Sequence, residues 1–160
     1  MKESKAKALS AIFRIARVEI EEISLAPHKV KILPPADEGF IFETNVGLKI
    51  EPKNKEIIIG VRAKIFSDRE KTNSLGKFEA KTTFIIENFS DFPIKGNSIM
   101  IPEIAMINFV SIAISTARGI LVPYTINTPL KDAILPVQNP VFIAKQLQTK
   151  VTNPTVIETE

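Results

Sequence analysis

The stretch from Ile101 to Gly119 constrains the fold of this chain most strongly, because it has the signals of an α-helix at both ends. Pro102 suits a first helical position, where the missing N–H costs nothing. Glu103 follows in the first turn, where a negative charge meets the positive end of the helix dipole. Arg118 lies in the last turn, and Gly119 follows it as a common stop signal. The sequence therefore predicts a helix that ends at Gly119.

This predicted helix carries more apolar surface than one sheet covers. At about 100° per residue, its polar residues share one narrow stripe: Asn108, Ser111, Ser115 and Arg118. Apolar residues occupy about 220° of the remaining circumference, whereas a surface helix usually needs little more than about 100°. A chain of this length offers few internal segments to cover the excess, so we predict that another copy of the chain does so. The residues expected at this oligomer interface are Met106, Val110, Ala113 and Ala117.

Composition excludes several classes of protein. The 160 residues fit a single domain, and the lack of cysteine excludes disulfides and thiolate metal sites. The net charge of +3 comes from scattered lysines, and the chain has no Trp and one Tyr, so the basic, aromatic surface typical of nucleic-acid binding is not indicated. The run 101–119 is short for a membrane span, and Arg14 interrupts the first apolar run, which is too short for a secretory signal. We expect a cytoplasmic protein that neither binds nucleic acid nor inserts into a membrane.

Four stretches before the helix alternate apolar and polar residues as β-strands do. The first, at 12–25, shifts its alternation twice, which predicts a bulge or bend at each shift. The other three are expected at residues 46–50, 56–66 and 75–87. Prolines after the helix exclude further helix until about residue 141, where 141–150 fits a short second helix. This order predicts an α+β fold with a four-stranded antiparallel sheet, in one domain over 12–150 with flexible ends at 1–11 and 151–160.

No set of residues typical of an enzyme or a metal site stands out. His28 is the only histidine, and no carboxylates lie at a spacing that completes a metal site around it. The six glycines are spread singly, without a phosphate-binding loop. Several glutamates alternate with apolar residues, as on a solvated sheet face: Glu19, Glu21 and Glu22. We therefore predict a protein that is not an enzyme and that has no catalytic residues, metal or other cofactor.

Apolar side chains also occur in segments that are expected to face water. Phe40 and Phe42 follow the breaker-rich segment Ala26–Gly39, which is long for a connection inside a compact domain. Phe89 and Phe92 lie in a predicted turn, and more apolar residues lie among prolines after the helix: Ile120, Leu121, Val122, Tyr124 and Ile126. A smaller number of such apolar residues would fit a minor hydrophobic cluster beside the main core. Together, these residues fit a groove for extended, apolar polypeptide.

Several short runs carry a resemblance to a known family. Two lie in the first strand, one in the second, and the most specific one around and after the end of the long helix: Phe13-x-Ile15-x-Arg17-Val18, Glu22-Ile23-Ser24 before Ala26-Pro27, Val46-x-Leu48-x-Ile50, and Arg118-Gly119 followed by Leu135-Pro136-Val137. In this order they are similar to segments of SecB, the cytosolic export chaperone of bacteria, and of its SecB-like relatives. The resemblance covers most of the chain, from about residue 13 to residue 142.

The resemblance implies a four-stranded antiparallel sheet with long helices, assembled as a homotetramer that is a dimer of dimers. It also implies an ATP-independent holdase, which binds unfolded polypeptides or preproteins along apolar grooves beside the crossover loop and the helix. By their position on the matching segments, the residues implied in or near such a groove are Phe40, Phe42, Phe84, Phe109, Val122 and Phe142.

The family also presents acidic residues on its sheet face to the ATPase SecA, and here the match is incomplete. Glu22 keeps one acidic position, but Leu25 replaces its neighbour, and Lys77 stands after Leu75 where an acid is expected. SecA is thus a partner to be tested, with Glu22 and Leu75 at the docking face. Two further functions stay open, namely a SecB-like chaperone of an antitoxin and a carrier of a small hydrophobic ligand in a closed cavity.

Overall fold

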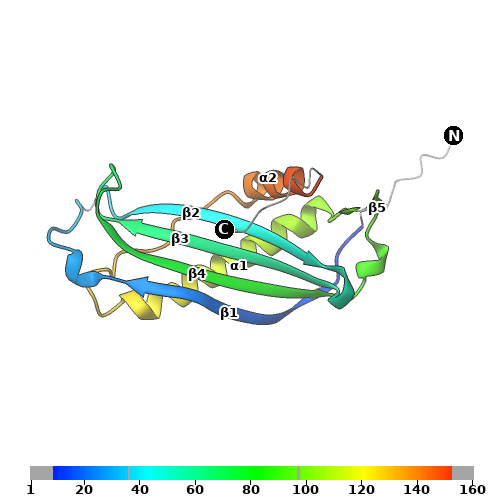
Figure 1. Cartoon of the computed structure of the whole chain (residues 1–160), viewed down its shortest axis with the longest axis horizontal. Coiled ribbons are helices and arrows are strands. Elements are labelled where there is room, and N and C mark those ends of the chain that lie inside the picture. Colours follow the sequence, from blue (N-terminus) through cyan, green and yellow to red (C-terminus); the bar gives the residue numbers. More distant parts are fainter. Residues whose placement is uncertain (1–8, 36, 97, 153–160) are drawn as a thin grey trace.

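The computed structural model describes the backbone of residues 9–35, 37–96 and 98–152, and the side chains of these ranges up to residue 148. A four-stranded sheet lies in front of the long helix α1 (Glu103–Thr125), and the shorter α2 (Pro140–Thr152) lies beside strand β2 (Figure 1). The prediction of an α+β fold with a long helix and a short C-terminal helix is confirmed. The ends expected to be flexible, 1–11 and 151–160, fall mostly outside the described residues.

The sheet is antiparallel, with the strand order β1-β4-β3-β2. Its strands are β1 (Phe13–Leu25), β2 (Ile41–Glu51), β3 (Glu56–Phe66) and β4 (Ser74–Ile86). The second strand begins earlier than the sequence predicted, because residues 41–45 pair with residues 62–66 of β3. The remaining short elements are the 3-10 turns Pro27–Lys29, Pro52–Asn54 and Phe89–Asp91, and the small hairpin β5 (Ile94–Lys95) and β6 (Ser98–Ile99).

Strand β1 is irregular at both places where its sequence alternation shifts. Its pairing with β4 slips between Ile15 and Arg17, and again between Ile20 and Glu22. Each slip inserts a residue and returns the next apolar side chain to the helix side of the sheet. The two predicted bulges are therefore confirmed.

Helix α1 continues to Thr125, so the prediction that it ends at Gly119 is wrong. Ala117, Leu121 and Thr125 are buried at intervals of four residues, so the last turns are held by tertiary packing rather than by local stop signals. Pro123 lies inside the final turns, where the hydrogen bond that it lacks is only the one to the carbonyl of Gly119.

The core lies between the sheet and α1. Phe13, Phe84 and Phe109 form its aromatic centre, with the Phe109 ring centroid 4.8 Å from those of both Phe13 and Phe84. Phe89 and Phe92 are also buried and contact each other, with ring centroids 5.7 Å apart. These two residues belong to the core and not to a groove.

Two later segments supply the extra apolar layer that α1 requires. Ala144 and Leu147 of α2 are buried, as are Leu130, Ala133 and Leu135 in the connection between the helices. The Arg118 side chain holds this connection, because its guanidinium donates to the carbonyl oxygens of Leu135 at 2.8 Å and Pro136 at 3.1 Å. Part of the excess apolar surface of α1 is thus covered within one chain, although Ile104 stays 66% exposed.

This packing corrects the predicted oligomer interface. Met106, Val110, Ala113 and Ala117 are all buried inside a single subunit, so none of them is available to a second copy. The prediction was wrong because no local sequence signal shows that residues 130–135 and α2 pack over α1. By length and composition α1 could span a bilayer, but core helices share these properties, and 44% of its most apolar window is buried in the fold.

Candidate functional site

A hollow of about 240 Å³ opens between β2 and α2. Its lining comes from β2, from the segment before α2 and from α2 itself: Thr44, Asn45, Val46, Gln138, Phe142, Ile143, Gln146 and Leu147. Because β2 is the last strand of the sheet, one of its edges pairs with β3, and no described strand pairs with the other. We call this site the β2–α2 hollow.

The β2–α2 hollow combines apolar and hydrogen-bonding groups. Phe142 is 61% exposed at its rim, and Ile143 packs partly against the core. The Thr44 hydroxyl is buried and has no hydrogen-bond partner among the described residues. Gln138 and Gln146 add amide groups that donate as well as accept. An extended polypeptide segment matches these features, because it can pair with a strand edge while one of its side chains contacts Phe142.

The crossover segment Ala26–Gly39, which joins β1 to β2, presents a second apolar surface. Ile32 is 83% exposed, and Leu33 is exposed beside it. With their neighbours they line a hollow of about 290 Å³ next to the β3–β4 connection. The segment is tied to β4 by a hydrogen bond from the Ala26 N–H to the Leu75 carbonyl oxygen at 2.7 Å, and to the β3–β4 connection by an ion pair of Arg69 with Glu38 at 3.2 Å. These contacts fix the backbone of the segment while the side chains of Ile32 and Leu33 stay exposed to solvent.

The end of α1 lies at the same end of the molecule as the crossover segment (Figure 1). Exposed apolar side chains occur here too, namely Val122, Tyr124 and Ile126. Val122 is accessible, and its predicted place in a groove stays a prediction.

Strand β1 leaves a third apolar surface on the helix side of the sheet. Ile15, Val18 and Ile20 are exposed there, although the β4 residues that they pair with are buried. The reason is that α1 packs over β3 and β4 and leaves the middle of the edge strand uncovered. We call Ile15, Val18 and Ile20 the β1 apolar strip.

The architecture has a counterpart among solved structures. A SecB-like chaperone from Mycobacterium tuberculosis, solved in complex with a ChAD peptide from the HigA1 antitoxin, matches it with a TM-score of 0.53 over 79% of this chain and 89% of that chain. The fold is SecB-like. The two sequences are 12% identical, and neither a family model nor a curated protein matches the chain. The fold implied by the sequence resemblance is confirmed at the level of architecture.

Within this SecB-like fold, the six predicted groove residues separate into three groups. Phe142 and Val122 are exposed, and Phe40 and Phe42 lie half-buried against the core. Phe84 and Phe109 are fully buried between the sheet and α1, so neither is accessible to a client, and they are corrected to core residues.

Other residues of the β2–α2 hollow were not predicted from the sequence. Val46 was predicted only as a strand residue and Thr44 was assigned to no element, because no local signal shows that α2 lies beside β2. The exposed Ile32 and Leu33 had a visible signal, since they stand between lysines and prolines in a segment without regular structure.

The sheet face opposite the helices, here called the outer face, does not form an unbroken acidic surface. Leu75 is fully buried, which corrects its placement at a docking face. Glu22 is exposed, and it pairs in register with Glu79 on β4. Arg62 binds Glu79 through its Nε at 2.9 Å and its Nη2 at 3.2 Å. The Glu79 hydrogen bonds and charge raise the pKa of Arg62, and the charge of Glu22 adds to this.

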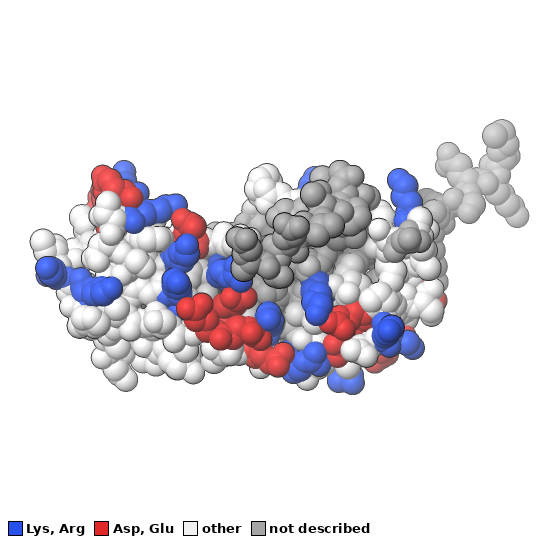
Figure 2. Space-filling model, viewed as in Figure 1, with Lys and Arg blue, Asp and Glu red and all other residues white. Residues whose placement is uncertain are grey.

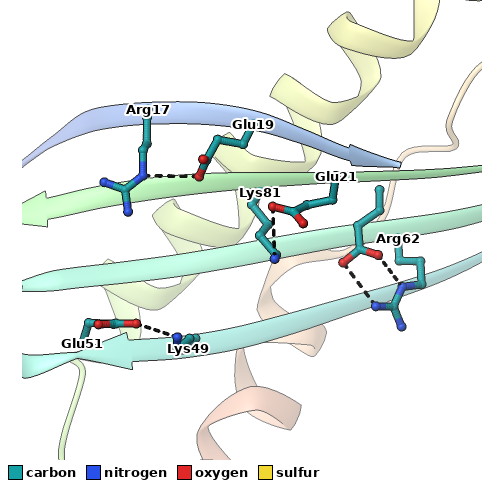
Figure 3. Close-up of polar contacts among 8 residues, drawn as sticks. Arg17, Glu19, Glu21, Lys49, Glu51, Arg62 and Lys81 are labelled. Atoms are coloured by element: carbon teal, nitrogen blue, oxygen red, sulfur yellow. Dashed lines mark hydrogen bonds and ion pairs between the residues drawn. The ribbon is translucent and has the colours of Figure 1, made fainter. Parts of the chain in front are cut away.

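Most charges on the outer face are paired with one another. Figure 3 shows the pairs Arg17–Glu19, Lys81–Glu21 and Lys49–Glu51 beside the pair at Arg62. In the space-filling view, acidic and basic residues are intermixed across this face (Figure 2). Such pairing is the opposite of a surface built to attract a strongly charged partner.

One pair on this face spans three strands. Arg17 of β1 donates to both carboxylate oxygens of Glu56 on β3, at 2.9 and 3.1 Å. β4 lies between these two strands, and Thr83 on its outer side is fully buried. The hydrogen bond from Arg17, with its positive charge, lowers the pKa of Glu56 against the opposing effect of burial. The pair therefore ties the edge strand β1 to the centre of the sheet.

Proposed function

We propose that this protein is a chaperone that binds unfolded polypeptide segments as an ATP-independent holdase. The observation that carries the proposal is the β2–α2 hollow, where a free strand edge lies beside the exposed Phe142. Strand edges bind extended peptides through main-chain hydrogen bonds, which do not depend on the client's sequence. The SecB-like fold supports this function, and the function requires neither a catalytic residue nor a cofactor.

The crossover segment extends the proposed binding surface. Ile32 and Leu33 offer apolar contacts at a separate place, so a long client has more than one point of attachment. Several weak contacts along one flexible chain raise the overall affinity through effective concentration. This arrangement suits an unfolded client better than a short folded one.

The test compares two aspartate substitutions at exposed apolar residues. Phe142→Asp places a charge at the rim of the β2–α2 hollow, whereas Ile94→Asp does so in the β5–β6 hairpin, where Ile94 is 72% exposed. Binding of reduced, unfolded α-lactalbumin without ATP is measured by calorimetry. We expect Phe142→Asp to weaken binding about tenfold or more, as for loss of a central apolar contact, and Ile94→Asp to leave it unchanged. If the unmodified protein does not bind this client, the proposal is wrong.

An antitoxin is a second candidate client, and it is supported by the peptide bound to the structural neighbour. A synthetic ChAD peptide that competes with α-lactalbumin for the same site would favour this client over exported preproteins. A carrier of a small hydrophobic ligand is less well supported, because Phe78, Phe84, Phe109 and Met106 fill the space between the sheet and α1. Mass spectrometry of the purified protein would reveal a retained lipid.

We further propose that the chain forms a homo-oligomer, a tetramer by the family resemblance, through the β1 apolar strip. A second copy would cover Ile15, Val18 and Ile20 and would also pair the exposed edge of β1. Light scattering of the unmodified protein should give a multiple of the 17.8 kDa chain mass, and Val18→Asp should reduce it. A monomer at high concentration would contradict this part of the proposal.

A more specific form of this proposal is that the protein is cytoplasmic and serves protein export with SecA as its partner. Glu22 is the one predicted docking residue that stays exposed. A pull-down with purified SecA, compared between the unmodified chain and Glu22→Gln, tests it directly.

A further inference from the structure

The outer face of the sheet contains the largest of the described hollows, with a volume of about 620 Å³. It lies over β2 and β3 and reaches the β1 side through long charged side chains (Figure 3). It opens on the face of the sheet opposite the helices, and Asn45 is the one lining residue that it shares with the β2–α2 hollow among the described residues. We call it the outer hollow.

Two glycines form the floor of the outer hollow. Gly47 of β2 pairs directly with Gly60 of β3, and Lys81 of β4 is the next residue in the same row. The pairing of β2 with β3 continues through this row without a bulge. Two neighbouring strands therefore lack a side chain at the same point, which leaves their peptide planes bare.

No described residue requires glycine at these two positions. Neither residue has a positive φ. Among the described residues, a Cβ atom at Gly47 would meet nothing within 4 Å, and one at Gly60 would meet only the Cγ atom of Lys81 at 3.9 Å, an ordinary contact. Glycine inside a strand weakens the sheet, and it often marks a place where another molecule approaches the backbone. The described residues thus leave open the space above Gly47 and Gly60.

The rim of the hollow indicates what fits there. Four cations surround the floor, namely Arg17, Lys49, Arg62 and Lys81, and each is held in an ion pair with a glutamate. Because these charges balance, the rim does not select an acidic or a basic group. Fixed cations beside a flat floor do suit the face of an aromatic ring, through cation–π contacts and stacking on guanidinium.

We propose that the outer hollow binds an aromatic side chain presented by an extended segment of a partner protein. The ring lies on the peptide planes of Gly47 and Gly60, and it fills the place of the two missing side chains. The volume leaves room for the residues on either side of the ring. This docking surface goes beyond the proposed chaperone function, since it lies on the opposite face of the sheet from the helices.

The first test uses NMR on the full chain. Titration with the blocked peptide Gly-Gly-Trp-Gly-Gly should move the amide signals of Gly47 and Gly60 upfield through the ring current. The same peptide with Leu in place of Trp should move them much less. Equal shifts with both peptides, or none with Trp, would overturn the proposal. Shifts with N-acetyltryptophanamide but not with the Trp peptide would also overturn it, because the site would then bind a small molecule.

The second test fills the hollow by mutation. Gly47→Val restores a β-branched side chain on the edge strand where no atom is close, so we expect it to raise the melting temperature and to abolish the shifts at Gly60. Gly47→Ala is the milder variant, with the same direction of both effects. Phe142→Asp serves as the control and should leave the shifts unchanged. Binding of the Trp peptide by Gly47→Val at the original strength would overturn the proposal.

Discussion

The two faces of the sheet are made by the same strands, but they differ in almost every physical respect. On β3, the side chains that face α1 are fully buried, as Ile57, Ile59 and Ile65 show, whereas Arg62 and Lys64 between them face water. Side chains alternate along a strand, so one sequence supplies both surfaces. The side chains that face α1 form the core, and the residues that alternate with them form the charged outer face.

The helices do not cover the whole of the sheet face on which they pack. Helix α1 covers the two central strands, whereas the β1 apolar strip and the edge of β2 at the β2–α2 hollow stay accessible. Apolar groups of an otherwise closed core thus reach the surface at the two edges of the sheet. These edges are the places where we propose contacts with a second copy and with clients.

The largest effect is expected from removing an aromatic ring at the centre of the buried face. Phe109→Ala should lower the free energy of unfolding by about 3–5 kcal/mol, because it leaves a cavity against Phe13 and Phe84. Phe142→Ala, at an exposed phenylalanine, is the matched control and should change it by about 0.5 kcal/mol or less. Urea unfolding measures both. Equal losses in the two variants would remove the distinction between core and groove phenylalanines.

A smaller effect is expected where α1 holds the connection to α2. Arg118→Ala removes the donors to the carbonyl oxygens of Leu135 and Pro136, which should cost about 1–3 kcal/mol of stability. Hydrogen exchange should show faster opening of residues 130–136 than of the sheet. Arg118→Lys keeps the charge but loses the forked geometry, so it should restore only part of the loss. Unchanged exchange in both variants would contradict this role of Arg118.

Much of this fold could be predicted from the sequence, because strand alternation is a local signal. Both bulges in β1 were read from the apolar pattern alone, since a slip of one residue exchanges the two faces. The short C-terminal helix was also predicted, because no proline occurs between Pro140 and Pro154. The end of α1 was missed, because the burial of Leu121 and Thr125 overrides the local signals of Gly119 and Pro123.

The candidate site was predicted only in part, for a related reason. Phe142 and Val122 are exposed, and their role in a groove stays a prediction, whereas Phe84 and Phe109 were placed in a groove although they are core residues. Phenylalanines of the two kinds look alike in a sequence. What separates them is their place in the packed fold, since Phe84 and Phe109 face each other between the sheet and α1, whereas Phe142 lies on the outside of α2.

Stability should fall when two hydrogen-bonded carboxylates are protonated, namely Glu56 on the outer face and Asp68 in the connection between β3 and β4. Hydrogen bonds lower the pKa of Glu56, through Arg17, and of Asp68, chiefly through the Thr72 backbone N–H. Folding therefore favours their ionised forms, and this stabilisation is present above the ordinary pKa values of 4.5 and 3.8 and is lost as the pH falls through the lowered ones. We expect the melting temperature to be level near neutral pH and to fall below about pH 4.5.

The variant Glu56→Gln sharpens this test. It should have a lower melting temperature at pH 7 and a weaker dependence on pH below about 4.5, because one of the two responding carboxylates is gone. Glu87→Gln, at an exposed carboxylate just after β4, should keep the original pH profile. An unchanged profile in Glu56→Gln would mean that the pair across β4 does not contribute to stability.

The smallest effect is expected from the exposed ion pairs around the outer hollow. Lys49→Met removes the partner of Glu51 at a site open to water and salt, so the free energy of unfolding should change by about 0.5 kcal/mol or less. The same variant should nevertheless weaken binding of the Trp peptide, because it removes one of the four cations at the rim. Weaker binding of the Trp peptide with an unchanged free energy of unfolding would show that Lys49 on the outer face contributes to binding and not to stability, unlike the residues of the buried face. A large loss of stability would instead make these charges part of what holds the sheet together.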